Sequence, residues 1–312
     1  MFVALAGGVG AAKLLAGLAT VVDPVEITVV VNTGDDLVLH GLHISPDIDS
    51  VTYALAGLEN KTTGWGVVGE TWTVAENLKA LGGVSWFQLG DRDLATHLFR
   101  AQRLAEGATL GEVTAELAAA RGVAARLIPM SDDPVRTRVS LAEPPAGEDA
   151  EVAFQDYFVR LHHDVAVASI RFDGAEFARP ARGVLDAIGG AELVICCPSN
   201  PIVSIGPILA VPGIQAALQA RRDTVVAVSP IVAGAALKGP ADRLLRELGH
   251  ESSALGVARL YAPWVRTLVI DEADAALASG IEALDMRCVV APTVMSDATR
   301  AANLAKVVLS AV

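Results

Sequence analysis

The sequence predicts an α/β protein with a Rossmann-like, doubly wound, mostly parallel sheet and an inserted small α+β subdomain. Six apolar runs are nearly continuous rather than alternating, which is typical of strands buried on both faces of a parallel sheet. Amphipathic helical patterns lie between these runs and give a strand–helix–strand order. The apolar runs are residues 2–6, 27–31, 193–197, 224–228, 268–270 and 288–291, and the helical patterns include residues 11–22, 241–248 and 298–309.

The middle of the chain departs from this order. Residues 74–81, 94–105 and 110–121 have the pattern of helices. Residues 137–141 and 152–161 predict a small β element, which the loop 143–151 interrupts. We therefore expect one domain over residues 1–312, with a Rossmann-like core at about 1–131 and 182–312 and an inserted subdomain at about 132–181.

Composition excludes several classes of function. The formal net charge is −12 and no run is rich in Lys or Arg, which argues against a nucleic-acid partner. Three cysteines, two of them adjacent (Cys196 and Cys197), form no disulfide or zinc pattern and are expected to be buried strand thiols in a reducing compartment. No basic segment precedes the first apolar run, so we expect no signal peptide and a cytoplasmic protein.

One uncharged stretch, residues 193–220, is long enough to span a bilayer. Four prolines interrupt it, at positions 198, 201, 207 and 212. Prolines break a helix, so we expect a strand, a loop and a short helix in the core, and no membrane partner.

Ligands of open α/β sheets bind outside the carboxyl ends of the strands. This rule gives five segments in which to look for the site: residues 7–10, 32–36, 90–93, 199–201 and 229–230.

The first of these segments is a glycine loop between a strand and a helix. Gly7, Gly8 and Gly10 would let backbone amides approach an anion, which the helix N-terminus also favours. The loop lacks the Gly-Lys-Ser/Thr end of a Walker A loop, and Lys13 stands where a dinucleotide fingerprint has its third glycine. We expect it to bind phosphate, the alternative being a tight turn. Lys13 could reach that phosphate or be a packed helix residue.

Four carboxylates, Asp35, Asp36, Asp47 and Asp49, lie within fifteen residues. Crowded carboxylates repel one another unless a cation is bound, and hard oxygen ligands beside a phosphate suit Mg²⁺. Alternatively, Asp47 or Ser45 caps the helix that follows. Asp49 lies further into that helix and faces another way, which favours a functional role.

The motif LGDRDLATH places Asp91, Arg92 and Asp93 after an apolar segment, residues 86–89. The planar guanidinium of Arg92 can grip a phosphate or carboxylate while the flanking acids fix its orientation. The alternative is an ordinary salt bridge at a helix N-terminus. We expect His97, one turn later, to be a core histidine.

Patterns for other chemistries are incomplete. His40 and His43 have the spacing of a zinc pair but no third ligand nearby, so we expect one of them to contact a ligand instead. There is no Gly-x-Ser-x-Gly elbow and no Cys/His pair. Catalysis should therefore rest on positioning and electrostatics. The proline-rich loops 129–137 and 198–209 offer polar groups to a nucleotide base or sugar, although packing could also explain their prolines.

Taken together, these motifs resemble the 2-phospho-L-lactate transferase family, which makes the deazaflavin coenzyme F-420. The resemblance runs in order from residue 1 to residue 297. Its motifs are LAGGVGAAKLLAGL, VVNTGDDLVLHGLHISPDIDSVTYAL, WGVVGETW, LGDRDLATH, PMSDDPVRT, FQDYFV, CPSNPIVSIGPIL, VAVSPIVAGAALKGPADRLL and APTVMSD.

The resemblance implies a reaction that requires magnesium. The terminal hydroxyl of the deazaflavin precursor Fo attacks a three-carbon acid activated by guanosine diphosphate, and GMP leaves. The transferred group is 2-phospholactyl, phosphoenolpyruvyl or phosphoglyceryl, and the actinobacterial character of the motifs favours phosphoenolpyruvyl. A homodimer is also implied. The alternative is a nucleotide-sugar-binding regulatory protein of the same superfamily.

The resemblance also assigns residues. Gly7, Gly8 and Gly10 would cradle the diphosphate, and Asp49 with Asp36 would hold Mg²⁺ or orient the Fo hydroxyl. As a third catalytic residue, Arg92 would contact the substrate. The further substrate-binding residues that we expect are Lys13, Asn32, Thr33, His43, Asp91, Ser199, Asn200 and Ser229.

Overall fold

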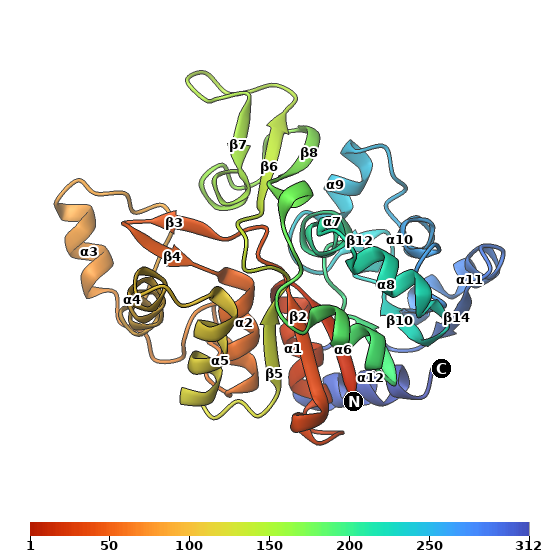
Figure 1. The fold of residues 1–312 in the computed structure, drawn as a ribbon. Helices are drawn as coiled ribbons and strands as arrows, with labels where there is room; N and C mark the ends of the chain where they lie inside the picture. Colours follow the sequence, from red (N-terminus) through yellow and green to blue (C-terminus); the bar gives the residue numbers. More distant parts are fainter. Residues whose placement is uncertain (312) are drawn as a thin grey trace.

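Seven strands form the central parallel sheet of the computed structural model, which describes residues 1–311 (Figure 1). The strands are β1 (Phe2–Ala6), β2 (Ile27–Val31), β5 (Arg126–Pro129), β9 (Leu193–Cys196), β10 (Val225–Val228), β13 (Thr267–Ile270) and β14 (Arg287–Val290). They lie in the order β14-β13-β10-β9-β1-β2-β5, and every pair of neighbours is parallel.

The predicted α/β class is confirmed. Each of the six apolar runs forms a strand of this sheet, with ends within one residue of those predicted. Edge strand β5 was not predicted, because its four residues RLIP include an exposed arginine and a proline. Residues 86–89, expected to precede a site at a strand end, form no strand and lead directly into a helix.

Helices cover both faces of the sheet (Figure 1). Successive side chains of β1 point to opposite faces, so Val3 and Leu5 belong to one core cluster and Ala4 and Ala6 to the other. The helices are α1 (Gly8–Leu18), α2 (Pro46–Leu55), α3 (Thr73–Ala80), α4 (Asp91–Ala105), α5 (Leu110–Ala120), α6 (Val184–Gly190), α7 (Gly206–Ala210), α8 (Ile214–Ala220), α9 (Ala241–Glu247), α10 (Ala254–Tyr261), α11 (Ala278–Glu282) and α12 (Ala298–Leu309).

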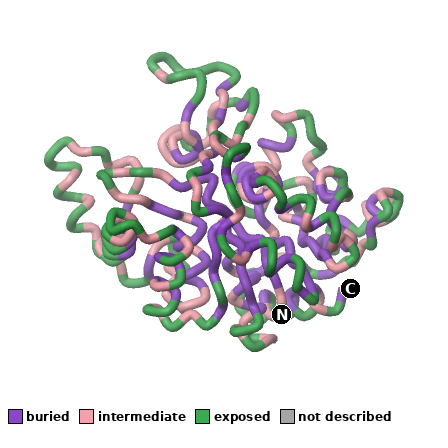
Figure 2. Tube along the Cα trace, in the orientation of Figure 1, coloured by how far each residue is buried: buried purple, intermediate pink, exposed green. Residues whose placement is uncertain are grey.

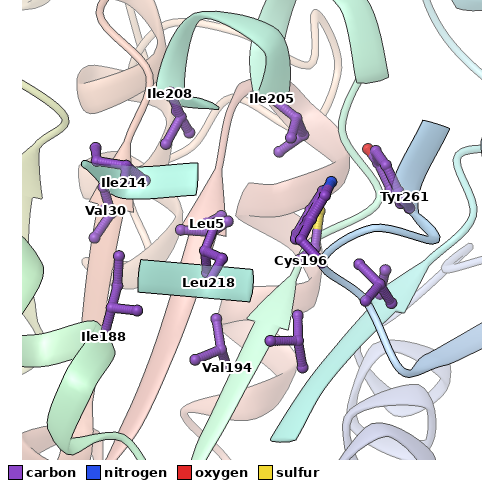
Figure 3. Close-up of a cluster of buried hydrophobic side chains, with 14 of the residues drawn as sticks. Leu5, Val30, Ile188, Val194, Cys196, Ile205, Ile208, Ile214, Leu218 and Tyr261 are labelled. Carbon is purple, nitrogen blue, oxygen red and sulfur yellow. The ribbon is translucent and has the colours of Figure 1, made fainter. Parts of the chain in front are cut away.

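Figure 2 shows the burial that results, with buried backbone concentrated along the sheet and its flanking helices and exposed backbone at the periphery. In one cluster, helices α6, α7 and α8 contribute Ile188, Ile208, Ile214 and Leu218, which pack against Leu5 of β1 (Figure 3). The other cluster is built mainly from α1, α2 and α12. Cys196 and Cys197 are buried at the end of β9 as free thiols, as predicted.

Strand order reverses between β1 and β9, which are neighbours in the sheet although they are far apart in the chain. Beyond the ends of these two strands lie the glycine loop and the loop that begins at Pro198. This is the position at which open α/β sheets bind ligands.

Smaller β elements extend from the carboxyl edge of the sheet (Figure 1). The hairpin β3 (Leu37–Leu39) and β4 (Leu42–Ile44) follows β2, and β11 (Ile231–Val232) pairs with β12 (Ala235–Ala236). A separate antiparallel sheet has the order β7-β6-β8, with β6 (Arg136–Leu141), β7 (Glu151–Ala153) and β8 (Val167–Asp173).

The predicted β segment 152–161 is wrong in most of its length. Only residues 151–153 are a strand, and Asp156–Arg160 form a short π-helical turn that places Tyr157 in the core. Strand β8 was not predicted, because four of its seven residues are exposed and their pattern is not apolar.

Among residues 1–311, no single helix is long and apolar enough to cross a membrane. The two segments Pro201–Ala210 and Ile214–Ala220 pass the length and composition test only as a pair, bent by 94°. They belong to the uncharged stretch 193–220, which divides into a strand, a loop and short helices as its prolines predict.

Candidate active site

The glycine loop packs directly against the loop after β9. The N–H of Gly7 donates to Ser199 Oγ at 3.2 Å. A Cβ at Gly7 would lie 2.6 Å from the Cβ of Ser204, and one at Gly10 would overlap the carbonyl oxygen of Pro198. Gly8 has a φ of +74°, which side chains disfavour. Close packing therefore accounts for glycine at positions 7 and 10, and backbone conformation accounts for it at position 8.

The amide that a phosphate would use is already occupied by a carboxylate. The N–H of Gly8 donates to Asp47 Oδ1 at 2.6 Å. Helix α2 presents this side chain, which reaches back to α1 instead of capping its own helix. The alternative role for Asp47 as the cap of its own helix is therefore wrong. Ser45 does occupy the N-cap position of α2, and its side chain makes no cap hydrogen bond there. Whether the loop binds phosphate stays a prediction.

Asn32, at the end of β2, joins two buried carboxylates. Its Nδ2 donates to Asp35 Oδ1 at 2.7 Å and to Asp47 Oδ2 at 2.9 Å, and its Oδ1 accepts from the N–H of Gly34. Burial raises the pKa of Asp47 to about 7. Burial, together with repulsion from Asp47 and Asp36, raises the pKa of Asp35 well above its ordinary value. The end of β2 therefore concentrates negative charge that favours a proton or a cation.

Asp36 faces the β3–β4 hairpin. Its Oδ2 lies 2.9 Å from His43 Nε2 and accepts from Ser45 Oγ at 2.8 Å. Its Oδ1 is buried and has no hydrogen-bond partner among the described residues, and the hydroxyl of Thr33 is in the same condition. The other histidine of the spacing pair, His40, lies at the exposed tip of the hairpin with a φ of +54°, so the two do not form a zinc pair.

Residues 1–311 contain no preformed group of three or more His, Cys, Asp or Glu residues that could hold a metal ion. Mg²⁺ does not need one, because it often binds through one or two carboxylates and completes its shell with water and substrate phosphates. The free, buried Oδ1 of Asp36 fits that mode of binding.

Asp49 is buried on α2, where it forms a two-pronged ion pair with Arg100 of α4. Arg100 Nη1 donates to Asp49 Oδ2 at 3.1 Å, and Nη2 donates to Oδ1. Arg100 is fully buried, and its Nη1 also lies 3.2 Å from His97 Nδ1. Each carboxylate oxygen can accept two hydrogen bonds, so each oxygen of Asp49 has acceptor capacity beyond its bond to Arg100.

The three charged residues of LGDRDLATH have separate partners. Asp91 accepts from the backbone N–H groups of Thr73 and Val74 at the start of α3. Asp93 accepts from the hydroxyl of Tyr53 at 2.5 Å. Arg92 is exposed and donates to the carbonyl of Val68 at 3.0 Å. The expectation that both flanking acids orient Arg92 is therefore wrong.

The remaining predicted polar residues contact backbone groups. Asn200 Oδ1 accepts from the N–H of Ile202, and Ser229 Oγ donates to the carbonyl of Ile231. Lys13 Nζ donates to the carbonyl of Met295 at 3.3 Å, which ties α1 to the segment before α12. All three lie beyond or near strand ends, and their roles in binding stay predictions.

A cavity of about 290 Å³ opens between the β3–β4 hairpin and the small sheet. Its lining includes Asp35, Asp36, Trp86, Arg136 and Gln155. The last three were not predicted as site residues, because nothing in a single sequence brings residues 86, 136 and 155 together.

Arg100 is the main residue that the sequence analysis missed, although a signal was present. Asp93, His97 and Arg100 are spaced i, i+4 and i+7, which places them on one face of a helix. All three are buried on the face of α4 that meets α2 and β4. His97 is a core histidine as predicted, within a charged network.

Comparisons with known proteins agree with one another. The sequence model of the family described as "2-phospho-L-lactate transferase CofD" matches residues 2–305. A protein of Kitasatospora aureofaciens named phosphoenolpyruvate transferase is 45% identical over 311 residues, covering 99% of this chain and 96% of that protein. A Thermobifida fusca protein of the same name is 45% identical, covering 97% and 95%. One of Mycolicibacterium smegmatis is 42% identical, covering 86% and 85%.

Solved structures share the fold. A protein from Bacillus halodurans superposes with a TM-score of 0.64 at 16% sequence identity, covering 99% of this chain and 98% of that one. A second structure, described as a UPF0052 family member from the same organism, gives a TM-score of 0.61 at 16% identity. At this identity the likeness extends to the architecture alone.

Proposed function

The chain belongs to the 2-phospho-L-lactate transferase family, and we propose that it transfers a phosphoenolpyruvyl group from a guanosine diphosphate-activated donor to the terminal hydroxyl of Fo. Family membership by itself supports the broader activity, a phospho-acid transferase of coenzyme F-420 biosynthesis. The choice of phosphoenolpyruvyl is supported by the name shared by the relatives at 42–45% identity.

In the proposed reaction, the hydroxyl oxygen of Fo forms a bond to the phosphorus that carries the three-carbon acid. The bond from that phosphorus to the bridging oxygen breaks, and GMP leaves with the electron pair. The hydroxyl proton passes to solvent. Such transfers depend mainly on in-line positioning and on neutralising charge at the phosphate oxygens.

We assign the catalytic roles by the free acceptor positions in the site. Asp49 accepts a hydrogen bond from the Fo hydroxyl and orients it, because each of its oxygens has acceptor capacity beyond its bond to Arg100. Asp36 holds Mg²⁺ through its unpartnered Oδ1. The ion, when bound, supplies positive charge at the transferring phosphate. Arg92 contacts the donor with its exposed guanidinium.

One observation carries the proposal beyond family membership. Motifs from distant parts of the chain meet at the switch point of the sheet, where Gly7 contacts Ser199, Gly8 contacts Asp47, and Asp47 contacts Asn32. The sequence separations of the first two contacts are 192 and 39 residues. Open α/β sheets bind ligands at this location, beyond the carboxyl ends of strands at a switch point, which supports a donor site here.

The direct test mixes the purified protein with Fo, Mg²⁺ and each of the three guanylylated acids in turn. Mass spectrometry should detect Fo extended by a phosphoenolpyruvyl group, together with GMP, and at the highest rate with that donor. If product forms only with one of the other two donors, the transferred acid is that of the active donor and not phosphoenolpyruvate. Absence of product from all three, with tight binding of a uridine nucleotide sugar and no binding of Fo, would replace the transferase with a regulatory protein.

We also propose a homodimer, as the family resemblance implies. Sedimentation velocity at micromolar concentration should give a mass near twice 32.3 kDa. A single species at the monomer mass would contradict this part of the proposal.

A further inference from the structure

A fully buried guanidinium connects three parts of the site. Arg100 of α4 binds both oxygens of Asp49 on α2, and its Nη1 also lies 3.4 Å from the carbonyl oxygen of His43 on β4. One side chain therefore holds the helix that carries Asp49 against the hairpin that faces Asp36. Arg100 has no exposed surface, so solvent does not compete for its hydrogen bonds.

A second layer of contacts holds Arg100 itself. Arginine can only donate, so His97 Nδ1, 3.2 Å from Arg100 Nη1, must accept. The proton of the His97 ring therefore lies on Nε2, which is 3.3 Å from Asp93 Oδ2 but makes no hydrogen bond among the described residues. Asp93 in turn accepts from Tyr53. His97 is thus packed between Asp93 and Arg100, and its Nδ1 contacts one edge of the guanidinium.

Burying this charged network between two helices carries a large desolvation cost. Buried ion pairs often add no net stability compared with apolar residues of similar volume, because each charge must lose its hydration. An Arg–carboxylate pair does fix geometry, since its two parallel hydrogen bonds set the plane and the orientation of the carboxylate. That geometry matters most where a carboxylate must meet a reacting group in one orientation.

We propose that Arg100 is the positioning residue of Asp49: it holds that carboxylate in one orientation toward the acceptor hydroxyl, and His97 with Asp93 holds Arg100 in turn. The inference rests on the proposed function, in which Asp49 orients the hydroxyl. It assigns no contact between Arg100 and substrate.

The first variant is Arg100→Lys, which keeps the buried charge and removes the two-pronged geometry. We expect kcat to fall by at least about 10-fold, while the KM for the guanylylated donor changes by less than about 2-fold, because donor binding does not use Asp49. Arg103→Lys is the matched control. Arg103 lies one turn later on α4 and makes the same two-pronged contact, to Glu116, at the surface. Its kcat should stay at the wild-type value.

A double-mutant cycle separates positioning from a general structural role. If Arg100 acts through Asp49, Arg100→Lys should slow the wild type but add nothing in the Asp49→Asn background, measured per folded molecule. Wild-type kcat in Arg100→Lys, or effects of the two changes that multiply, would overturn the inference. Where Arg100→Lys does not fold, His97→Gln takes its place in the same cycle, with the same two outcomes.

The same measurements distinguish the inference from the proposed function. A wild-type protein that forms no product overturns the proposed function, and the inference with it. An active wild type with independent effects at residues 49 and 100 overturns the inference alone.

Discussion

Asp47 holds the position that a bound phosphate would compete for. Its Oδ1 accepts from the N–H of Gly8 at the N-terminus of α1, where the partial positive charge of the helix favours an anion. Burial raises the pKa of Asp47 to about 7. The pKa of its neighbour Asp35 is also raised well above its ordinary value. Two effects therefore oppose each other at Asp47. The N-terminus of α1 favours the ionised carboxylate, and burial favours the protonated carboxyl.

This balance predicts that stability decreases as pH rises toward neutrality. The ordinary pKa of Asp47 is 3.8, and the folded value is about 7. Between these values the folded state holds one more proton than the unfolded chain, so the unfolding free energy falls by up to about 1.4 kcal/mol per pH unit. Below about pH 4 and above about pH 7 this contribution is constant. Denaturant unfolding in metal-free buffer from pH 4 to pH 8 measures it.

The Asp47→Asn variant is the control for that slope. It loses an acceptor and should be less stable than the wild type at pH 4, but it cannot take up the proton. Its unfolding free energy should therefore vary less between pH 4 and pH 7 than that of the wild type. Parallel pH profiles for the two proteins would show that Asp47 does not titrate in this range.

Arg92 differs from Arg100 because it is exposed and pairs only with a carbonyl, that of Val68. A lysine there keeps the charge but not the planar fork, so a role in gripping a phosphate or carboxylate predicts a loss of at least about 10-fold in kcat/KM for Arg92→Lys. Steady-state kinetics with saturating Fo measures this loss, and Arg103→Lys on the same helix is the control. An unchanged kcat/KM in Arg92→Lys would mean that Arg92 does not grip the substrate through a planar, two-pronged contact.

At the scale of elements, the apolar pattern was sufficient for the core but not for the edges. Runs such as residues 2–6 and 27–31 predicted buried strands because both of their faces are apolar. Strand β8 has an exposed side, and the short strand β5 begins with an exposed arginine and ends in a proline, so both lack that signal. The π-helical turn 156–160 was assigned to a strand because it is rich in aromatic and β-branched residues, which also occur in strands.

For the site too, the sequence predicts one part and not another: it predicts the location of the polar residues but not how they pair. Strand ends placed Asn32, Asp36 and Asp47 in one region, because parallel strands end at the same edge of a sheet. Which carboxylate pairs with which base could not follow from sequence. The contact of Asp49 with Arg100 spans 51 residues and depends on how α4 packs against α2. The sequence therefore places Asp49 within α2 but does not identify its partner.

One pair of helices depends on a single glycine. A Cβ at Gly17 of α1 would overlap the backbone of Ala301 in α12, so the two helices touch at this point. Gly17→Ala should lower the unfolding free energy by about 1–3 kcal/mol through overpacking. Since Gly17 lies near the C-terminal end of α1 and the glycine loop is at its N-terminal end, we expect kcat to be retained. Thermal or denaturant unfolding together with the product assay tests both parts.

A second glycine provides the comparison for that prediction. Gly189 lies in α6, and a Cβ there would meet nothing within 4 Å. Gly189→Ala should raise the unfolding free energy by about 0.4–1 kcal/mol, because alanine lowers the entropy of the unfolded chain. Equal losses of stability in both variants would mean that helix packing at Gly17 is not the cause.

At the scale of the whole molecule, the negative charge of the protein opposes binding of an anionic donor at the switch point. The chain carries a formal charge of −12, and the end of β2 adds buried carboxylates next to the switch point. The proposed donor is itself an anion with a diphosphate. Coulomb repulsion grows as the effective dielectric constant falls, so an acidic and partly buried site binds such a ligand poorly without compensating positive charge. Arg92 supplies one exposed cation, and Mg²⁺ would supply two further charges.

Binding of GDP should therefore depend strongly on a divalent ion. Isothermal titration should give a Kd at least about 10-fold lower with Mg²⁺ than with EDTA at matched ionic strength, because monovalent salt only screens charge. Asp36→Asn should remove most of this difference, and it should leave the Kd in EDTA unchanged or lower, since the variant has one negative charge fewer. Equal Kd values with Mg²⁺ and EDTA in the wild type would mean that protein groups alone neutralise the diphosphate. A Mg²⁺ effect that survives in Asp36→Asn would place the ion on another carboxylate, with Asp35 and Asp47 next to be replaced.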